Sequence, residues 1–372
     1  MKFYTNIQLI GNQFLIRGYE NGQHVTHREE WKPTLFVPSR KKTKYKTLEG
    51  ESVEPIQPGF VRDCREFYKK YDEVENFKIY GNDRYVYQYI SEKYPQDRIE
   101  FDIKKIKLVT IDIEVAAEQG FPDVENVAEE LLLISLQDYA TKKVTTFGSR
   151  DFVNKDPNVT YILCRDEVHL LSSFLAYWRK NLPEVITGWN SQMYDIPYLA
   201  GRINRVMGEK SMKDLSPWGL VSQSEVYISG RKNITYDIGG VTQLDYLDLY
   251  KRFTYTNQES YRLDYIANYE LGEKKLDHNE YDTFREFYTK DWDKFVRYNV
   301  KDVQLVDRLE DKLKLIELAV TMAFDAKVNF IDIHYQVRMW DTIIYNYLKK
   351  RNIVIPPKKR TSKSEKYAGA YV

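Results

Sequence analysis

The first residues whose chemistry stands out are two carboxylates that alternate along an expected strand. Asp112 and Glu114 lie within residues 109–115, where the intervening positions are Val or Ile. Side chains alternate along a strand, so both carboxylates share one face, about 7 Å apart. On a buried strand such charges repel and lose hydration, and a divalent cation would reverse that cost. The alternative is a pair on a strand face exposed to water.

A second polar group follows the short apolar strand expected over residues 185–189. Asn190 comes directly after this strand, and Asp195 stands at the start of the helix expected over 196–206. Ligand sites in α/β sheets favour the ends of strands. Asp195 is therefore a candidate functional carboxylate, and its alternative role is to cap the helix.

A third pair lies on the long helix expected over residues 291–315. Tyr298 and Asp302 are four residues apart and so share one helix face. A phenol beside a carboxylate could aim a water molecule held by a metal ion. The alternative is a solvated helix face, on which this spacing is common.

Periodicity and turn residues predict the elements that must position these side chains. Strands followed by a helix–strand–helix order predict an α/β fold, with helices packed on a mixed sheet. The expected elements are a β-meander over 1–37 with turns at 11–12 and 21–22, a loop over 38–60, strands over 106–115, 130–139 and 143–147, a helix beginning at Asp166 with Val168, Leu171, Leu175 and Trp178 on its buried face, a hairpin over 220–240 with its tip at 229–232, and a helix over 332–351.

The order of these three groups resembles a known family of nucleases. An Asp-x-Glu pair, then Asn and Asp five apart, then Tyr and Asp four apart resemble the Exo I, Exo II and Exo III motifs of DEDDy 3′→5′ exonucleases. This resemblance implies a ribonuclease H-like exonuclease domain, in which a mixed sheet is flanked by helices.

Further stretches resemble the amino-terminal part of a family B DNA polymerase of the T-even bacteriophage kind. They are Leu247–Lys251, Thr256–Gln258, Leu263–Ile266, Trp340–Ile344 and Tyr367–Val372. The resemblance implies an α+β amino-terminal domain of residues 1–106, completed by 316–372, and an exonuclease domain of residues 107–315. In the family, the palm begins just after the last of these stretches. We therefore expect a truncated polymerase or a split subunit, with no polymerase active site in this chain.

The resemblance also implies roles for individual residues. Two divalent cations, Mg²⁺ or Mn²⁺, would be held by carboxylates, as hard oxygen ligands allow. The implied ligands are Asp112, Glu114, Asp195 and Asp302. Tyr298 would help to position the attacking water, and Lys275 would face the scissile phosphate. Lys274 is the alternative to Lys275, and an exposed loop is the alternative for both lysines.

Four residues are expected to contact DNA. Phe121 matches an aromatic residue that packs against terminal bases, and Asn190 would bond the terminal nucleotide. Arg231 and Lys232, at the hairpin tip, would meet phosphates. The alternatives are a loop Phe packed on the core, an Asn that ties down its own turn, and turn charges that only aid solubility.

Composition limits the classes of function. Lys and Arg number 56 and Asp and Glu 55, so the chain is not a globally basic nucleic-acid binder, although a local basic groove remains compatible with it. Two Cys exclude a disulfide framework, and no apolar run approaches the ~20 residues of a membrane span. We expect a cytoplasmic bacteriophage protein that acts on single-stranded or frayed 3′ DNA and on primer–template DNA. Expected partners are a palm, fingers and thumb polymerase chain, a sliding clamp contacted indirectly, and RNA; no membrane is expected. A template DNA- or RNA-binding and assembly module is the alternative function.

Overall fold

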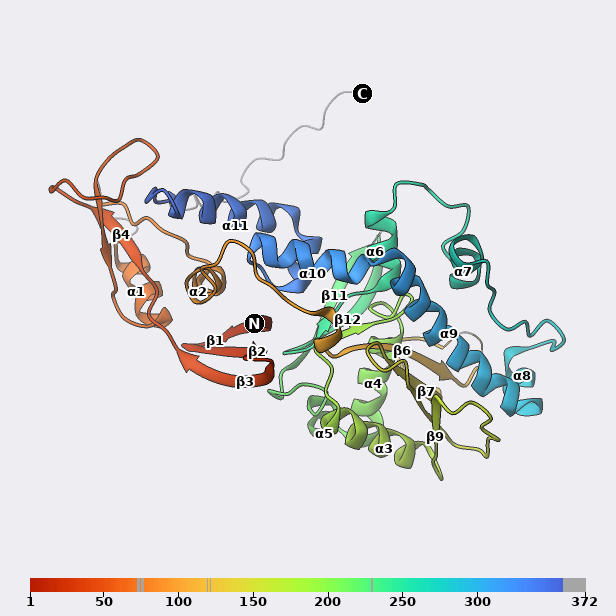
Figure 1. The fold of residues 1–372 in the computed structure, drawn as a ribbon. Coiled ribbons are helices and arrows are strands. Elements are labelled where there is room, and N and C mark those ends of the chain that lie inside the picture. The colour runs from red at the N-terminus through yellow and green to blue at the C-terminus, as the bar shows by residue number, and fades with distance from the viewer. Residues whose placement is uncertain (72–73, 75–76, 119, 121, 229, 357–372) are drawn as a thin grey trace.

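The computed structural model describes residues 1–356, apart from 72–73, 75–76, 119, 121 and 229. The amino-terminal strands and α1 (Val61–Tyr71) lie at one end of the molecule. A larger α/β body lies at the other end, and α10 (Leu315–Ala326) runs between the two (Figure 1).

Residues near the amino terminus form the expected meander. The strands β1 (Lys2–Ile10), β2 (Gln13–Glu20) and β3 (Gln23–Glu30) pair antiparallel in that order. The second turn contains Asn21 and Gly22, with φ of 53° and 80°, which suits the tight turn that Asn-Gly favours. The expected loop over 38–60 contains part of a further hairpin, of β4 (Leu35–Pro38) and β5 (Val53–Ile56).

The larger body contains a six-stranded mixed sheet of order β13-β10-β6-β7-β8-β9. Its central strand β6 pairs parallel with β10 and antiparallel with β7. The expected strands at 106–115, 130–139, 143–147 and 185–189 are all present, whereas β9 and β13 were not expected. The bounds are β6 (Leu108–Val115), β7 (Leu131–Asp138), β8 (Val144–Gly148), β9 (Val159–Leu163), β10 (Val185–Thr187) and β13 (Thr242–Gln243).

Helices cover both faces of this sheet, as predicted. On one face, Ile111 and Ile113 share an apolar core with α3 (Glu167–Lys180) and α4 (Asp195–Met207). On the other face, α9 (Trp292–Leu313) packs across β6 and β7. The carboxylates of β6 alternate with Ile111 and Ile113 and therefore point toward α9.

The remaining elements surround the sheet or join it to the amino-terminal part. They are α2 (Tyr85–Lys93), η1 (Ile103–Lys105), α5 (Glu209–Lys213), β11 (Val221–Ile228), β12 (Arg231–Ile238), α6 (Tyr246–Phe253), α7 (Leu263–Leu271), α8 (Phe284–Lys290), η2 (Phe330–His334) and α11 (Gln336–Lys349). Among the described helices, none is both long and apolar enough to cross a bilayer.

Several sequence-based expectations were wrong in detail. Val168 is 53% exposed, because α3 buries the neighbouring stripe of Leu170, Leu171 and Phe174. The helix expected over 291–315 ends at Leu313, and a second helix follows Lys314, whose φ is 56°. The helix expected from residue 332 begins at Gln336, after η2. The strands of the 220–240 hairpin extend to Ile228 and Arg231, so its tip is shorter than expected.

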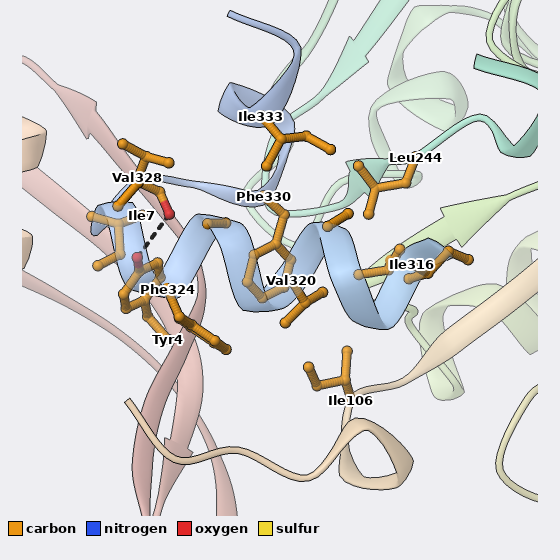
Figure 2. Packing of buried hydrophobic residues seen from close by; sticks show 14 of the residues in the cluster. Tyr4, Ile7, Ile106, Leu244, Ile316, Val320, Phe324, Val328, Phe330 and Ile333 are labelled. Atoms are coloured by element: carbon orange, nitrogen blue, oxygen red, sulfur yellow. Dashed lines mark hydrogen bonds between the residues drawn. The ribbon is translucent and has the colours of Figure 1, made fainter. Parts of the chain in front are cut away.

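An apolar cluster around α10 holds the amino-terminal strands against the rest of the chain. Figure 2 shows Phe324 and Val320 of this helix beside Tyr4, Ile7 and Phe330. The rings of Phe324 and Tyr4 lie 5.2 Å apart, edge to face. The Tyr4 hydroxyl donates to the Val328 carbonyl oxygen at 2.7 Å, so the cluster also satisfies its buried polar group.

Truncation of this cluster tests its contribution to stability. Phe324 is 1% exposed, so Phe324→Ala should lower the free energy of unfolding by about 3–5 kcal/mol through lost transfer energy and a cavity. Leu318→Ala, on the same helix but 42% exposed, is the matched control and should cost less than about 1 kcal/mol. Urea unfolding of both variants measures the difference, and equal losses would contradict this assignment of the core.

A buried carboxylate spans the break between α9 and α10. Glu310 is 2% exposed and accepts hydrogen bonds from the backbone N–H groups of Ile316 at 2.9 Å and Glu317 at 3.2 Å. These are amino-terminal N–H groups of α10, which lack partners within the helix. Burial raises the pKa of Glu310 from 4.5 to about 7, although these hydrogen bonds favour its charged form.

This raised pKa predicts a pH-dependent stability. The folded chain binds the Glu310 proton more tightly than the unfolded chain, so the contribution to stability is full below pH 4.5 and is lost as the pH rises through about 7. Glu310→Gln does not titrate. Its free energy of unfolding should rise relative to wild type by roughly 2–3 kcal/mol between pH 4.5 and 8. Chemical denaturation across this range measures the difference, and a pH-independent difference would contradict the prediction.

Candidate active site

Three acidic side chains from two elements converge above the sheet. Asp112 and Glu114 of β6 and Asp302 of α9 each offer a carboxylate oxygen, and the three oxygens lie within 4.8 Å of one another. The alternation along β6 brings the first two together, and the packing of α9 across this strand adds the third. Glu114 is 8% exposed and Asp302 is 4% exposed. These values exclude the two alternatives, a carboxylate pair on an exposed strand face and a tyrosine–aspartate pair on a solvated helix face.

A fourth carboxylate lines the same cleft. Asp195 is the first residue of α4, and its Oδ1 accepts a hydrogen bond from the backbone N–H of Ile113 at 3.0 Å. The side chain therefore reaches across to β6, and the helix cap at this position is Tyr194. The cleft has a volume of about 1430 Å³, and all four carboxylates line it.

Burial and mutual repulsion disfavour the charged forms of these groups. Desolvation raises the pKa of Asp112 well above its ordinary value, and the charges of Asp302, Asp195 and Glu114 raise it further. Desolvation likewise raises the pKa of Glu114 and Asp302, and it raises that of Asp195 to about 7. These four carboxylates can be ionised together only when a positive charge lies nearby.

Lys275 provides one such charge. Its Nζ donates to Asp302 Oδ2 and lies 3.4 Å from the Tyr298 hydroxyl oxygen. Burial alone would lower the pKa of Lys275, but the charge of Asp302, with Tyr298 and Asp112, outweighs it and raises that pKa. Lys274 is exposed and lines only a neighbouring hollow, so the two lysines that the sequence left open occupy different environments.

The donor set fits a hard divalent cation. Asp302 Oδ1 is buried and has no hydrogen-bond partner within the described part of the chain. A buried carboxylate oxygen without a donor is costly, and a cation would satisfy it. Clustered carboxylate oxygens suit Mg²⁺ or Mn²⁺ rather than a soft metal.

Two buried residues of this site were missed by sequence analysis. Asn299 is fully buried, and its Nδ2 donates to Asp112 Oδ2 at 2.6 Å. It follows Tyr298 directly, but no spacing rule distinguishes it from a core position. Asp245 accepts hydrogen bonds from the backbone N–H groups of Asn190 at 3.1 Å and Gln192 at 2.9 Å, and it fixes the turn before α4. No sequence pattern identified it, because the short strand β13 that precedes it was not expected.

Of the residues expected to contact DNA, only some have side chains that the structure describes. Asn190 is exposed, has a φ of 67° and lines the cleft. Lys232 pairs with Glu225 of the neighbouring strand at 2.8 Å and with Glu125 at 3.9 Å. Arg231 begins β12, and its side chain lies outside what the structure describes, as does Phe121 altogether. The hairpin does border the cleft, through Asn233.

Comparison with known proteins assigns the family. Residues 69–266 match the model of the exonuclease domain of family B DNA polymerases, which includes β6, β10 and α4. This match spans more than half of the chain, and the chain therefore belongs to family B of the DNA polymerases. The ribonuclease H-like class expected for the domain is confirmed, with its mixed sheet between helices.

Similar proteins occur in bacteriophages and insect viruses. The DNA-directed DNA polymerase of Escherichia phage RB69 is 30% identical over 405 aligned positions, covering 100% of this chain and 44% of the relative. That of Enterobacteria phage T4 is 29% identical, with the same coverage. The DNA polymerase of Bombyx mori nuclear polyhedrosis virus is 28% identical, covering 44% of this chain and 16% of the relative. The chain thus spans less than half the length of these relatives.

The acidic cluster predicts a stability that depends on divalent cations. With EDTA, Asp112→Asn should raise the melting temperature, because it removes one repelling charge and retains an acceptor for Asn299. With Mn²⁺ at about 100 times its dissociation constant, wild type should gain about 2.7 kcal/mol, and the variant should lose most of this gain.

Thermal unfolding with and without Mn²⁺ provides the measurement. Asp311→Asn is the matched control, because Asp311 is an exposed partner of Lys142 outside the cleft. An equal Mn²⁺ effect in both variants would show that the cation binds elsewhere.

Proposed function

We propose that this chain is a two-metal 3′→5′ exonuclease that hydrolyses the 3′-terminal phosphodiester of DNA and proofreads for a replicative polymerase. One observation carries the proposal: four carboxylates, a tyrosine and a lysine line a single cleft in a chain of this family. A strand end entering the cleft would meet all six side chains at once.

The residues fit the cations that such a reaction uses. Asp112, Glu114 and Asp302 would hold one Mg²⁺ or Mn²⁺, and Asp195 would complete the ligand set for two. When bound, the cations would supply an activated water and neutralise charge on the departing 3′ oxygen.

The remaining polar groups position the reactants. Tyr298 is held between Lys275 and His278, whose ring lies 5.5 Å away, so its hydroxyl has a fixed direction for orienting a water. Lys275 lines the cleft and would contact the scissile phosphate, where its ammonium stabilises developing negative charge. Asn299 is a positioning residue, because it holds Asp112 without lining the cleft.

The substrate that suits this cleft is a frayed or single-stranded 3′ end. Asn190 would bond the terminal nucleotide, and Phe121 would stack on a terminal base. Arg231 and Lys232 would meet phosphates once Lys232 leaves its acidic partners. The product would be a deoxynucleoside 5′-monophosphate.

The same proposal divides the chain into two domains. Residues 107–315 would form the exonuclease domain, and residues 1–106 with 316–372 would form an amino-terminal domain. The partner would be a palm, fingers and thumb part of a polymerase, with a sliding clamp contacted indirectly, in the cytoplasm of the host cell. The names of the relatives, which are DNA polymerases, support this assignment.

A second candidate function rests on a basic loop in the amino-terminal part. Between β4 and β5, Arg40, Lys41, Lys42 and Lys44 are all exposed. Clustered cations suit a phosphate backbone, so this loop would bind template DNA or RNA. Such binding would accompany the exonuclease rather than replace it, because it leaves the carboxylate cluster unexplained.

An exonuclease assay tests the leading function. The purified chain with Mg²⁺ or Mn²⁺ should release mononucleotides from the 3′ end of a single-stranded oligonucleotide, and EDTA should stop it. Asp112→Ala with Glu114→Ala should reduce the rate at least ~1,000-fold, because the charge stabilisation is worth several kcal/mol. Absence of metal-dependent release by wild type, also when a polymerase part is supplied, would refute the proposal.

Tyr298→Phe tests the hydroxyl separately from the ring. We expect kcat to fall roughly 10- to 100-fold with little change in KM, because the water loses its orientation. Tyr281→Phe is the matched control: its ring also contacts Phe287, but its hydroxyl donates to Asp291 and does not line the cleft. Equal effects of the two substitutions would show that the Tyr298 hydroxyl has no special role.

A further inference from the structure

A second hollow adjoins the cleft at Asp112. It has a volume of about 830 Å³, and five residues line both spaces: Asp112, Trp189, Asn190, Lys275 and Tyr298. Glu114, Asp195 and Asp302 line only the larger cleft. Asp112 of the carboxylate cluster therefore lies at the boundary, and a group released beside it can enter the second hollow without returning past the hairpin.

The second hollow is lined by two cationic side chains without ion pairs among the described residues. Arg262, just before α7, and Lys274 both line it, and both are exposed. Among the described residues, neither forms an ion pair, whereas nearby Lys301 and Arg308 both pair with Glu273.

Besides Asp112 of the carboxylate cluster, two acidic residues line this hollow, and both accept backbone hydrogen bonds. Asp264 Oδ1 accepts from the backbone N–H of Lys275 at 2.9 Å, and Asp277 Oδ1 accepts from that of Asn279 at 2.9 Å. These bonds hold both carboxylates toward the backbone. Arg262 and Lys274, which form no ion pair among the described residues, and Lys275 at the boundary are therefore the groups that an anion in the hollow would contact.

The two spaces differ in volume and therefore suit different ligands. A volume of about 830 Å³ falls within the range of small-molecule sites, about 300–1,000 Å³, and the larger cleft exceeds it. The hairpin borders only the larger cleft, through Asn233. A strand therefore suits the larger cleft, and a single nucleotide suits the second hollow.

We infer that the second hollow binds the released nucleoside 5′-monophosphate, with its phosphate on Arg262 and Lys274. This inference rests on the proposed exonuclease function and adds a route for the product. Product would leave through the hollow while the shortened strand stays in the larger cleft, so successive removals need no release of the strand.

Product inhibition provides the test. The double variant Arg262→Ala with Lys274→Ala should raise the inhibition constant of added dTMP or dAMP about tenfold, more than it raises the KM for a single-stranded oligonucleotide. Equilibrium dialysis of labelled dTMP should show a matching loss of affinity. Both side chains are exposed, and an unchanged melting temperature verifies folding.

Two further variants distinguish nucleotide binding in the hollow from strand binding. Arg285→Ala is the matched control, because Arg285 lines only the larger cleft and pairs with Glu118; it should raise the oligonucleotide KM more than the inhibition constant. Arg262→Lys with Lys274→Arg should restore most of the affinity for dTMP. A raised KM with an unchanged inhibition constant in the Ala double variant would assign strand phosphates to the hollow and overturn the inference. If wild type shows no exonuclease activity, the proposed function fails, while dialysis still decides whether the hollow binds the mononucleotide.

Discussion

Repulsion among the four carboxylates is the constraint on which the rest of the structure depends. Burial disfavours the charged form of each, and neighbouring carboxylates of the cluster add to this cost at Asp112 and Glu114, so left free these side chains would separate. The fold prevents this, because β6, α4 and α9 are each anchored in apolar cores that lie away from the charges. Hydrophobic burial on both faces of the sheet thus stabilises an arrangement that electrostatics alone opposes.

Lys275 offsets part of this repulsion from within the chain. Its ammonium is bound to Asp302, one of the three clustered carboxylates. A divalent cation at the cluster could bind Asp302 through Oδ1, which has no hydrogen-bond partner among the described residues, while Lys275 holds Oδ2. The ammonium also lines the boundary of the cleft, where an incoming phosphate would provide a second negative partner. The same lysine can therefore serve the site before and after metal and substrate bind.

The sequence predicted those parts of the site that follow from local periodicity. Alternation along residues 109–115 placed Asp112 and Glu114 on one face, and helical spacing placed Tyr298 and Asp302 together. It could not distinguish Lys274 from Lys275, because the direction of a side chain in an irregular loop depends on contacts distant in sequence. Asn299 and Glu310 were missed for the same reason: their partners lie across the fold or beyond a helix break. Val168 was wrong because a four-residue stripe can fit two adjacent faces of one helix.

A buried polar network ties the amino-terminal meander to the sheet that holds the site. Glu184, directly before β10, accepts hydrogen bonds from Thr5 Oγ1 and the Tyr19 hydroxyl, each at 2.9 Å. Burial would raise the pKa of Glu184, but His24, Arg17 and the backbone N–H of Lys107 outweigh it and lower that pKa. Arg17 in turn donates to the carbonyl oxygen of Pro183 at 2.7 Å.

The main effect of this network is to orient the chain at the start of β10, and it adds little to the free energy of unfolding. A buried ionic cluster gains little net free energy over an apolar one, but it accepts only one geometry. Here that geometry sets where β10 begins, and β10 ends three residues before Asn190 and eight before Asp195. The two buried strands of the meander, β1 and β2, thus contact the start of β10, and the residues that follow the other end of β10 include Asn190 and Asp195, which line the cleft. The amino-terminal part therefore contacts the chain at the start of the strand that leads to the candidate active site, and none of its described residues lines the cleft.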